Sequence, residues 1–316
     1  MSDAWPRPLR SGDRVRLVAA SSALDDLERL AAGVAVLESW GLQVDPHPEP
    51  LRRWGYLAGA DDQRQADLQG SDPSNPGAAA LKACMRGGWG AARLLEPPQP
   101  VALANGWLLG FSDVTSLLWA QRAQGRCGGI HGPLLTTLAA EPDWSQERLR
   151  QLLFGEAVPA LQGEIWCGGM AEGPLLVGNL TVATHLLGTP HLPPLAGAVL
   201  VLEVVGEAPY RIDRLLTHWR LAGALQQLAG IGFGSFSGCD DADEAGEAVR
   251  EQQAGRRFSL EQVLRERTAD LGIPVLAGLP VGHIPGNAAL PIGARARIDG
   301  EQGLLSLVPP APPRQS

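Results

Sequence analysis

Short apolar runs alternate with amphipathic segments over the first 125 residues, and this alternation constrains the fold more than any other feature of the chain. The run "VRLVAA" at 15–20 has the composition of a buried strand, and the segment after it repeats apolar residues at helical spacing until Gly41. Because parallel strands need crossover connections, strands that alternate with helices predict a mostly parallel sheet flanked by helices. Further strands are expected at 42–48 and 105–111, helices at 61–70 and 113–123, and a strand or helix running into a glycine-rich turn at 79–95.

The chain is long enough for two domains, with 316 residues of which 45% are hydrophobic. The segment 151–175 starts polar and becomes rich in Gly and Pro, so we expect it to link an N-terminal α/β domain (1–150) to a smaller C-terminal α/β domain (176–316). In the C-terminal domain Asn179 is a candidate helix cap, and Ser259 with Gln262 forms a capping box. The short strands expected there lie at 197–205, 231–236, 274–279, 294–299 and 303–308, with helices at 180–187, 210–223 and 260–271.

Charge and composition exclude several classes of protein. Lys and Arg number 26 against 34 Asp and Glu, a net charge of -8, and no basic cluster is present, which argues against nucleic acid as a partner. The N-terminal apolar run is too short for a signal peptide or a membrane span, and the four cysteines are far apart, so we expect a cytoplasmic protein that does not act at a membrane. No metal-binding or P-loop pattern occurs, and neither a metal nor a cofactor is expected.

Three polar residues stand out against apolar surroundings near the ends of expected strands: Ser112, Glu203 and His283. Side chains at strand ends converge in open α/β sheets. These three have the types of a nucleophile, an orienting acid and a base. A serine hydroxyl is a weak nucleophile until an imidazole accepts its proton, and the imidazole needs a carboxylate to hold its tautomer.

The same chemistry requires backbone N–H donors for the oxyanion that forms on the attacked carbonyl. A serine at the start of a helix offers the next N–H group, here that of Asp113, whose backbone we expect to matter more than its carboxylate. The glycine-rich stretch "RGGWG" at 86–90 could supply a second donor near Gly88, because glycines let the backbone approach a ligand closely.

Each of the three candidate catalytic residues could instead have a purely structural role. Ser112 could cap the helix that follows it, Glu203 could extend its carboxylate into solvent, and His283 could be a hydrogen-bonded surface histidine. The stretch from Gly88 to Arg93 also resembles part of a dinucleotide-binding fingerprint, but Arg93 stands where its third glycine would be. A nucleotide-binding protein without catalytic activity therefore remains an alternative from another class.

Several segments in order, over nearly the whole chain, resemble the LD-carboxypeptidase family of serine peptidases, which includes the microcin C self-immunity hydrolases. The three motifs "GFSD", "RGGWG" and "PYRIDR" together are the most specific signature of this family in the chain. Trp89 stands where the family often has Tyr, and Val204 where it often has a second acid. The matching segments are "GYLAGADDQRQADL", "MRGGWGAARLL", "LLGFSDVTSLL", "HGPLL", "GNLTVATHLLGTP", "VLEVVGEAPYRIDRLLTHWRLAG" and "GLPVGHIPGNAALPIGARARID".

The resemblance implies a triad of Ser112, Glu203 and His283, with Ser112 on a nucleophile elbow. It also implies an oxyanion hole from the backbone of Asp113 and of the glycine loop near Gly88, a two-domain α/β fold, a metal-independent reaction and a homodimer. The family reaction removes the terminal D-alanine from the murein tetrapeptide during cell-wall recycling.

We therefore predict a serine carboxypeptidase that acts on a small peptide with a free carboxyl end. We expect the substrate to contact Arg86, Gly87 and Trp89, with Arg93 as another candidate for its carboxylate; surface ion pairs are the alternative for both arginines. The rival within the hydrolases is an amidase that detoxifies a peptide-nucleotide conjugate of the microcin C type.

Overall fold

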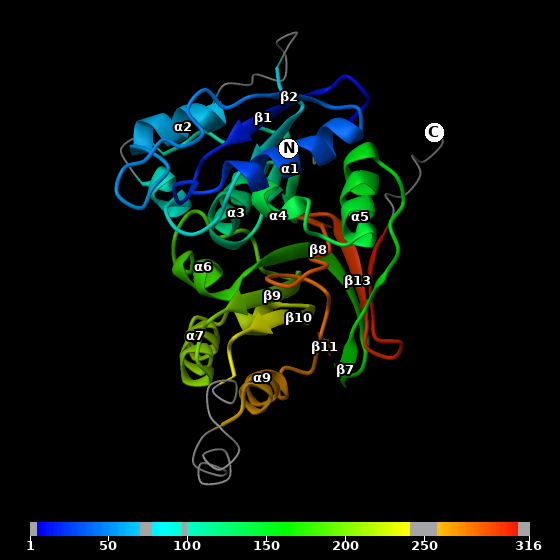
Figure 1. Ribbon diagram of the computed structural model, residues 1–316. Helices are drawn as coiled ribbons and strands as arrows, with labels where there is room; N and C mark the ends of the chain where they lie inside the picture. Colours follow the sequence, from blue (N-terminus) through cyan, green and yellow to red (C-terminus); the bar gives the residue numbers. More distant parts are fainter. Residues whose placement is uncertain (1–4, 70–77, 97–99, 241–257, 309–316) are drawn as a thin grey trace, which may run out of the picture. The chain divides into compact units, whose positions relative to one another are not determined.

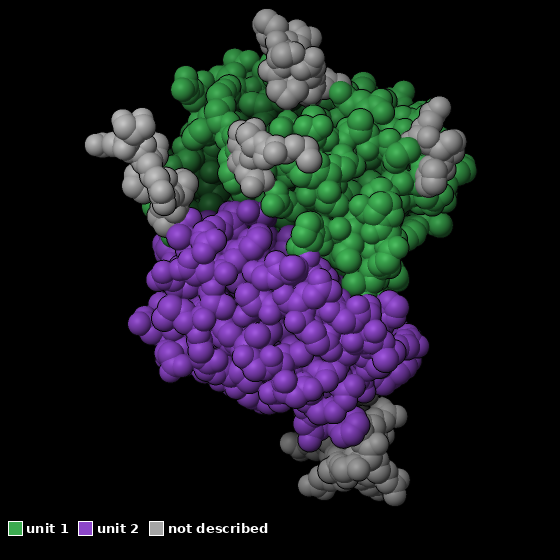
Figure 2. Space-filling view, turned by 180° about the vertical axis from the view of Figure 1, so that it is seen from behind, with its two compact units in different colours: residues 1–158, 177–194, 284–292 green, residues 159–176, 195–283, 293–316 purple. Residues whose placement is uncertain are grey.

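The computed structural model describes residues 5–69, 78–96, 100–240 and 258–308, which group into two compact units. Unit 1 comprises residues 1–158, 177–194 and 284–292, and unit 2 comprises residues 159–176, 195–283 and 293–316 (green and purple in Figure 2). Neither unit is continuous in sequence. Within the described residues, no helix is long and apolar enough to cross a membrane.

Unit 1 is built on a six-stranded sheet in the order β12-β5-β4-β3-β1-β2. Of these strands, β1 and β2 are labelled in Figure 1. The five strands from β2 to β5 pair in parallel, and β12 joins β5 antiparallel at the edge. The predicted mostly parallel sheet flanked by helices is confirmed. Its strands are β1 (Arg14–Val18), β2 (Gln43–Asp45), β3 (Leu81–Cys84), β4 (Trp107–Gly110), β5 (Gly129–His131) and β12 (Leu290–Pro291).

Helices cover both faces of this sheet, and the first three of them connect its successive strands. Their formation follows from local signals: Asp26 caps the first helix through its side chain, and Asn179 accepts the Val182 N–H at 3.2 Å, as its predicted capping role requires. The helices are α1 (Leu27–Ser39), α2 (Asp61–Gln69), α3 (Thr115–Ala123), α4 (Leu135–Leu138), α5 (Asp143–Phe154) and α6 (Leu180–His185), with 3-10 turns η1 (Ala91–Leu95) and η2 (Ser112–Val114).

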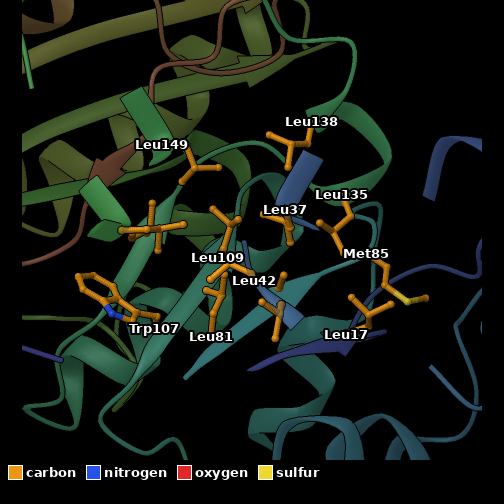
Figure 3. Close-up of a cluster of buried hydrophobic side chains, with 14 of the residues drawn as sticks. Leu17, Leu37, Leu42, Leu81, Met85, Trp107, Leu109, Leu135, Leu138 and Leu149 are labelled. Atoms are coloured by element: carbon orange, nitrogen blue, oxygen red, sulfur yellow. The ribbon is translucent and has the colours of Figure 1, made fainter. Parts of the chain in front are cut away.

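The core of unit 1 lies between one face of the sheet and helices α1, α4 and α5 (Figure 3). Successive residues of a strand point to opposite faces, so alternate positions of β1, β3 and β4 supply this core. Gly33 lets α1 approach α4, because a Cβ at this position would lie 1.9 Å from the Leu135 carbonyl oxygen. The buried strand residues are Val15, Leu17, Leu81, Ala83, Trp107 and Leu109.

Unit 2 contains an eight-stranded mixed sheet in the order β6-β14-β13-β8-β9-β10-β11-β7. Strands β9, β10 and β11 pair in parallel, while β6, β7, β13 and β14 join antiparallel neighbours. The strands are β6 (Leu161–Gln162), β7 (Glu164–Cys167), β8 (Met170–Asn179), β9 (Val199–Val205), β10 (Gly230–Ser237), β11 (Val275–Ala277), β13 (Arg295–Asp299) and β14 (Leu304–Leu307); the helices are α7 (Pro209–Leu221) and α9 (Leu260–Thr268), with η3 at Leu225–Gln227.

The structure differs from the expected domain layout at 151–175, which is not a linker. Helix α5 ends at Phe154, and β6, β7 and the first part of β8 then enter the sheet of unit 2. The glycines and prolines of this segment are typical of a loop, but β6 pairs with β14 and β7 with β11, more than 100 residues away. The capping box is confirmed, with Ser259 and Gln262 each accepting the other's backbone N–H at the start of α9.

Candidate active site

Ser112 lies on a strained turn two residues beyond the end of β4. Its φ of +60° makes it the one non-glycine residue with a positive φ in the described part of the chain. A left-handed backbone costs an L-residue about 1–2 kcal/mol, so the surrounding fold must hold it there. The turn is tight, because a Cβ at Gly110 would lie 2.8 Å from Val114 Cγ1. Ser112 thus stands at the carboxyl edge of the parallel sheet, where α/β proteins form their sites.

Ser112 does not occupy a helix-capping position. The N-cap of η2 is Phe111 and that of α3 is Val114, and neither makes a side-chain capping bond. Ser112 is instead the first residue of η2, which separates β4 from α3. The expected helix from 113 therefore begins as a 3-10 turn, and the capping alternative for Ser112 loses its geometric basis.

The glycine loop 86–90 packs directly on Ser112. A Cβ at Gly87 would lie 3.2 Å from Ser112 Cβ and 3.4 Å from its Oγ. Gly88 has a φ of +105°. The loop is held by Ser22, whose Oγ accepts the Trp89 N–H at 3.0 Å and whose own N–H donates to the Gly87 carbonyl at 3.2 Å. Sequence reasoning missed Ser22, although its place just after β1 was a signal.

Asp113 anchors the far end of this loop through its side chain. Its buried Oδ2 accepts the Ala91 N–H at 2.8 Å. Burial raises the pKa of the Asp113 carboxyl, and the bonds from Ala91 and Gly90 oppose that rise. The carboxylate therefore has a structural role that the sequence did not suggest. In the described part of the chain, the backbone N–H groups of Asp113 and Gly88 have no acceptor.

The side chain of Arg86 is tied to a neighbouring acid. It donates to the Ala23 carbonyl at 2.6 Å and to Asp25 Oδ2 at 2.8 Å, and Arg53 binds the same carboxylate. The two arginines lower the pKa of Asp25, Arg86 most strongly. The partnership with Asp25 could not be read from the sequence, because 61 residues separate it from Arg86.

Arg93, in η1, and Trp89, in the glycine loop, were the other two side chains considered for substrate contact. Arg93 forms an ion pair with Asp61 at 2.9 Å and lies over the ring of Trp54 at 5.6 Å. This engagement matches the surface ion-pair alternative for Arg93. Trp89, by contrast, is exposed.

Glu203 and His283 meet in unit 2. Glu203 sits on β9 and is fully buried, while His283 follows β11 and is half-buried. The distance between His283 Nδ1 and Glu203 Oε2 is 2.6 Å. A buried carboxylate needs such a partner, which also fixes the tautomer: with a proton on Nδ1, the basic nitrogen of the neutral ring is Nε2. The alternative of a solvent-exposed Glu203 is excluded.

The loop that carries His283 depends on Gly282. This glycine has a φ of +115°, and a Cβ on it would lie 2.6 Å from Glu203 Cβ, Glu203 Oε2 and Ser235 Oγ. The loop is further fixed by Ser237, whose Oγ donates to the His283 carbonyl at 2.9 Å. The sequence left open that His283 is a hydrogen-bonded surface histidine, and it did not indicate the supports from Gly282 and Ser237.

The residues predicted from the sequence thus fall into two local groups. In unit 1, Ser112 lies with Asp113 and the glycine loop; in unit 2, Glu203 binds His283. Among the described residues no group of three or more His, Cys, Asp or Glu side chains is arranged to hold a metal ion.

Comparison with known proteins decides the family. Models of the LD-carboxypeptidase N-terminal and C-terminal domains match residues 15–132 and 172–298. A murein tetrapeptide carboxypeptidase of Pseudomonas aeruginosa is 33% identical over 92% of this chain and 94% of its own. The chain belongs to the LD-carboxypeptidase family. In this LD-carboxypeptidase, Ser112 lies within the N-terminal match, and Glu203 and His283 lie within the C-terminal one.

One further sequence relative and one solved structure are similar to this chain along nearly its whole length. A "Putative carboxypeptidase" of Synechocystis sp. is 47% identical over 96% of this chain and 97% of its own. The crystal structure of muramoyltetrapeptide carboxypeptidase from Oxalobacter formigenes is similar with a TM-score of 0.79 and 25% identity, covering 93% of this chain and 97% of that one. The family is one of serine carboxypeptidases, and the fold is shared along nearly the whole chain.

Proposed function

We propose that the protein is a serine LD-carboxypeptidase that releases the terminal D-alanine of murein-type tetrapeptides, with Ser112 as nucleophile, His283 as general base and acid, and Glu203 as the orienting carboxylate. The observation that carries the proposal is the positive φ of Ser112, since backbone strain at one exceptional non-glycine position is typical of a functional site. The names of the relatives support the choice of substrate.

The reaction divides into two steps. Ser112 Oγ attacks the carbonyl carbon before the terminal residue while His283 Nε2 takes its proton. The tetrahedral intermediate collapses, the C–N bond breaks, and the imidazolium returns the proton to the leaving amine of D-alanine. Water then attacks the acyl-enzyme while His283 takes its proton; the ester bond to Ser112 Oγ breaks, and the imidazolium returns the proton to Oγ. Glu203 stabilises the imidazolium in both steps, for which its 2.6 Å bond to Nδ1 is suited.

The N–H groups of Asp113 and Gly88 would bind the developing oxyanion. Removing one such donor costs about 3 kcal/mol of transition-state stabilisation in other enzymes. Substrate binding would involve Arg86, Gly87 and Trp89. We assign the carboxylate of the substrate to Arg86, because its present partner Asp25 is an exposed carboxylate that a second carboxylate can replace.

Release of D-alanine from murein tetrapeptide, followed by mass spectrometry, tests the proposal. Ser112→Ala should lower kcat by at least about 10³-fold and abolish labelling by a fluorophosphonate. Ser116→Ala is the matched control, because Ser116 is a buried serine four residues on, whose hydroxyl has no hydrogen-bond partner among the described residues. Labelling that persists in Ser112→Ala would contradict the assignment of the nucleophile.

The same assay separates the alternatives. The amidase alternative would be favoured if the fluorophosphonate labels Ser112 and the protein hydrolyses an aminoacyl-nucleotide conjugate but not the tetrapeptide. Absence of labelling together with a thermal shift by ATP or NAD would favour the nucleotide-binding alternative.

We also propose a cytoplasmic homodimer that works without a metal or cofactor. The resemblance to the family supports the dimer, and light scattering after size-exclusion chromatography tests it. Activity retained in excess EDTA tests the second part.

A further inference from the structure

Unit 1 contains a cavity of about 450 Å³ at the amino ends of β3 and β4. This volume lies in the range of small-molecule sites. Ser112 follows the opposite, carboxyl end of β4, so the cavity is not part of the site described above. Trp5 packs against Trp107 at its mouth, with ring centroids 6.0 Å apart. The larger apolar side chains that line it are Trp5, Leu68, Leu103, Trp107 and Leu108, with Pro6 and several alanines beside them.

Lys82 faces this apolar cavity and is the only lysine of the chain. The other 25 of the 26 basic Lys and Arg residues are arginines. Lys82 is the second residue of β3, an interior strand between β1 and β4, where covered parallel sheets normally carry apolar side chains. Its register partners are Arg16 on β1 and Leu108 on β4, so the three side chains share one face of the sheet.

The positive charge of Lys82 is not compensated within the part of the chain that the structure describes, where its ammonium has neither a hydrogen bond nor an ion pair. Burial lowers the pKa of Lys82, and the positive charge of Arg16 lowers it further. Arg7, the other cation of the cavity wall, is bound to Asp13 at 2.6 Å. Lys82 is only partly buried, but a cation that faces an apolar cavity without a paired acid among the described residues favours an anion there.

The other polar side chains that line the cavity limit the kind of ligand that it can bind. The Gln121 amide group donates to the Ala104 carbonyl at 2.9 Å and to the Gly106 carbonyl at 3.1 Å, so its donors are already used. Asn105 also lines the cavity, and its Oδ1 accepts the Cys127 N–H at 3.0 Å. Among the described residues, Lys82 is thus the one cation of the wall without an ion pair, which suits a monoanion, and the apolar walls suit a hydrocarbon or aromatic body.

We propose that this cavity binds a small amphipathic monocarboxylate, whose carboxylate pairs with Lys82 and whose apolar body lies against Trp5 and Trp107. Binding there is independent of the hydrolytic site. It would stabilise the folded protein by mass action, because the unfolded chain has no such cavity.

Calorimetric titration of the full chain with octanoate, 1-octanol and octylammonium tests this proposal. Octanoate should bind at least tenfold more tightly than the alcohol, since a charge-assisted bond is the difference between them, and the ammonium should not bind. Lys82→Met should remove the preference for octanoate over octanol. Arg7→Met is the matched control, because it removes a cation of the same wall that is already paired; its octanoate affinity should stay within about twofold.

The single lysine permits a second readout in the unmodified protein. Acetylation by an N-hydroxysuccinimide ester, followed by peptide mass spectrometry, reports the rate at Lys82 with the N-terminal amine as internal reference. Octanoate should slow the reaction at Lys82 several-fold and leave the reference unchanged. Thermal denaturation should show Lys82→Met folded and no less stable than the wild type. Equal affinity for octanoate and octanol, no binding of either, or unchanged acetylation at Lys82 would overturn the proposal.

Discussion

Replacement of Gly282 by alanine should disable hydrolysis without touching a group that meets the substrate. The glycine precedes His283 and passes over Glu203 with a φ of +115°. An added Cβ would lie 2.6 Å from both Cβ and Oε2 of Glu203, a separation that real Cβ atoms do not adopt. The loop or the carboxylate must therefore move.

Two contributions destabilise the loop of the Gly282→Ala variant, and the movement that they force lowers kcat. A non-glycine residue in this backbone region costs about 1–3 kcal/mol. Overpacking a buried site costs about 1–3 kcal/mol more. Relief of the overlap requires a shift on the order of an ångström in the contact between Glu203 and His283, whose present distance is 2.6 Å. Because displacements of about 1 Å can cost roughly 10²-fold in rate, we expect kcat to fall by about that factor or more.

Gly278 provides the matched control for this substitution. It directly follows β11, four residues before Gly282, with a φ of +65°, and a Cβ on it would meet nothing within 4 Å. Gly278→Ala carries the backbone cost alone, so its free energy of unfolding should fall by about 1–2 kcal/mol while its kcat stays near the wild-type value. Urea denaturation and D-alanine release, measured on both variants at pH 7, give the comparison.

A Gly282→Ala variant with wild-type kcat would contradict this role of Gly282. Equal loss of activity in Gly278→Ala would also contradict it, since the effect would then come from the backbone of the loop in general and not from the contact with Glu203.

Two further predictions concern groups of unit 1 away from Ser112. Burial would raise the pKa of Asp67, but hydrogen bonds from His47 and Arg52 outweigh burial and lower that pKa. The Asp67 carboxylate therefore stabilises the folded protein at pH values above the ordinary carboxyl pKa. This stabilisation is lost as the pH falls through the lowered pKa of Asp67. Asp67→Asn should thus lose about 3–5 kcal/mol at pH 7, a deficit that narrows toward pH 2 in urea denaturation; a constant deficit would contradict the linkage. Burial raises the pKa of the Cys84 thiol to about 12, so a disulfide reagent at pH 8 should modify the half-buried Cys167 first and Cys84 only after unfolding, as peptide mass spectrometry can show.

The sequence predicted those elements whose signals are local. The alternation of strands and helices in the first 125 residues gave the parallel sheet of unit 1, and the caps at Asn179 and Ser259 form as expected. The short strands β6 and β7 were missed because their stability comes from partners far along the chain. For the same reason, the addition of β12 to the edge of the first sheet could not be foreseen.

The candidate site divides in the same way. The types of Ser112, Glu203 and His283 and their places at strand ends could be read from the sequence, whereas the supports of the site could not. Ser22 reaches the glycine loop across 67 residues, and Asp113 holds that loop through its carboxylate. Such contacts depend on which strand ends meet, and local periodicity carries no information about that.

By itself the sequence determined the parallel sheet, the order of the polar residues and the presence of a single lysine, because each depends on residue type and spacing along the chain. The burial of Glu203 against His283, 80 residues away, came from the tertiary structure, as did the position of Lys82 at an apolar cavity, where no acid among the described residues pairs with it. Burial and charge pairing arise from packing between distant segments, and they decide what a polar side chain can do.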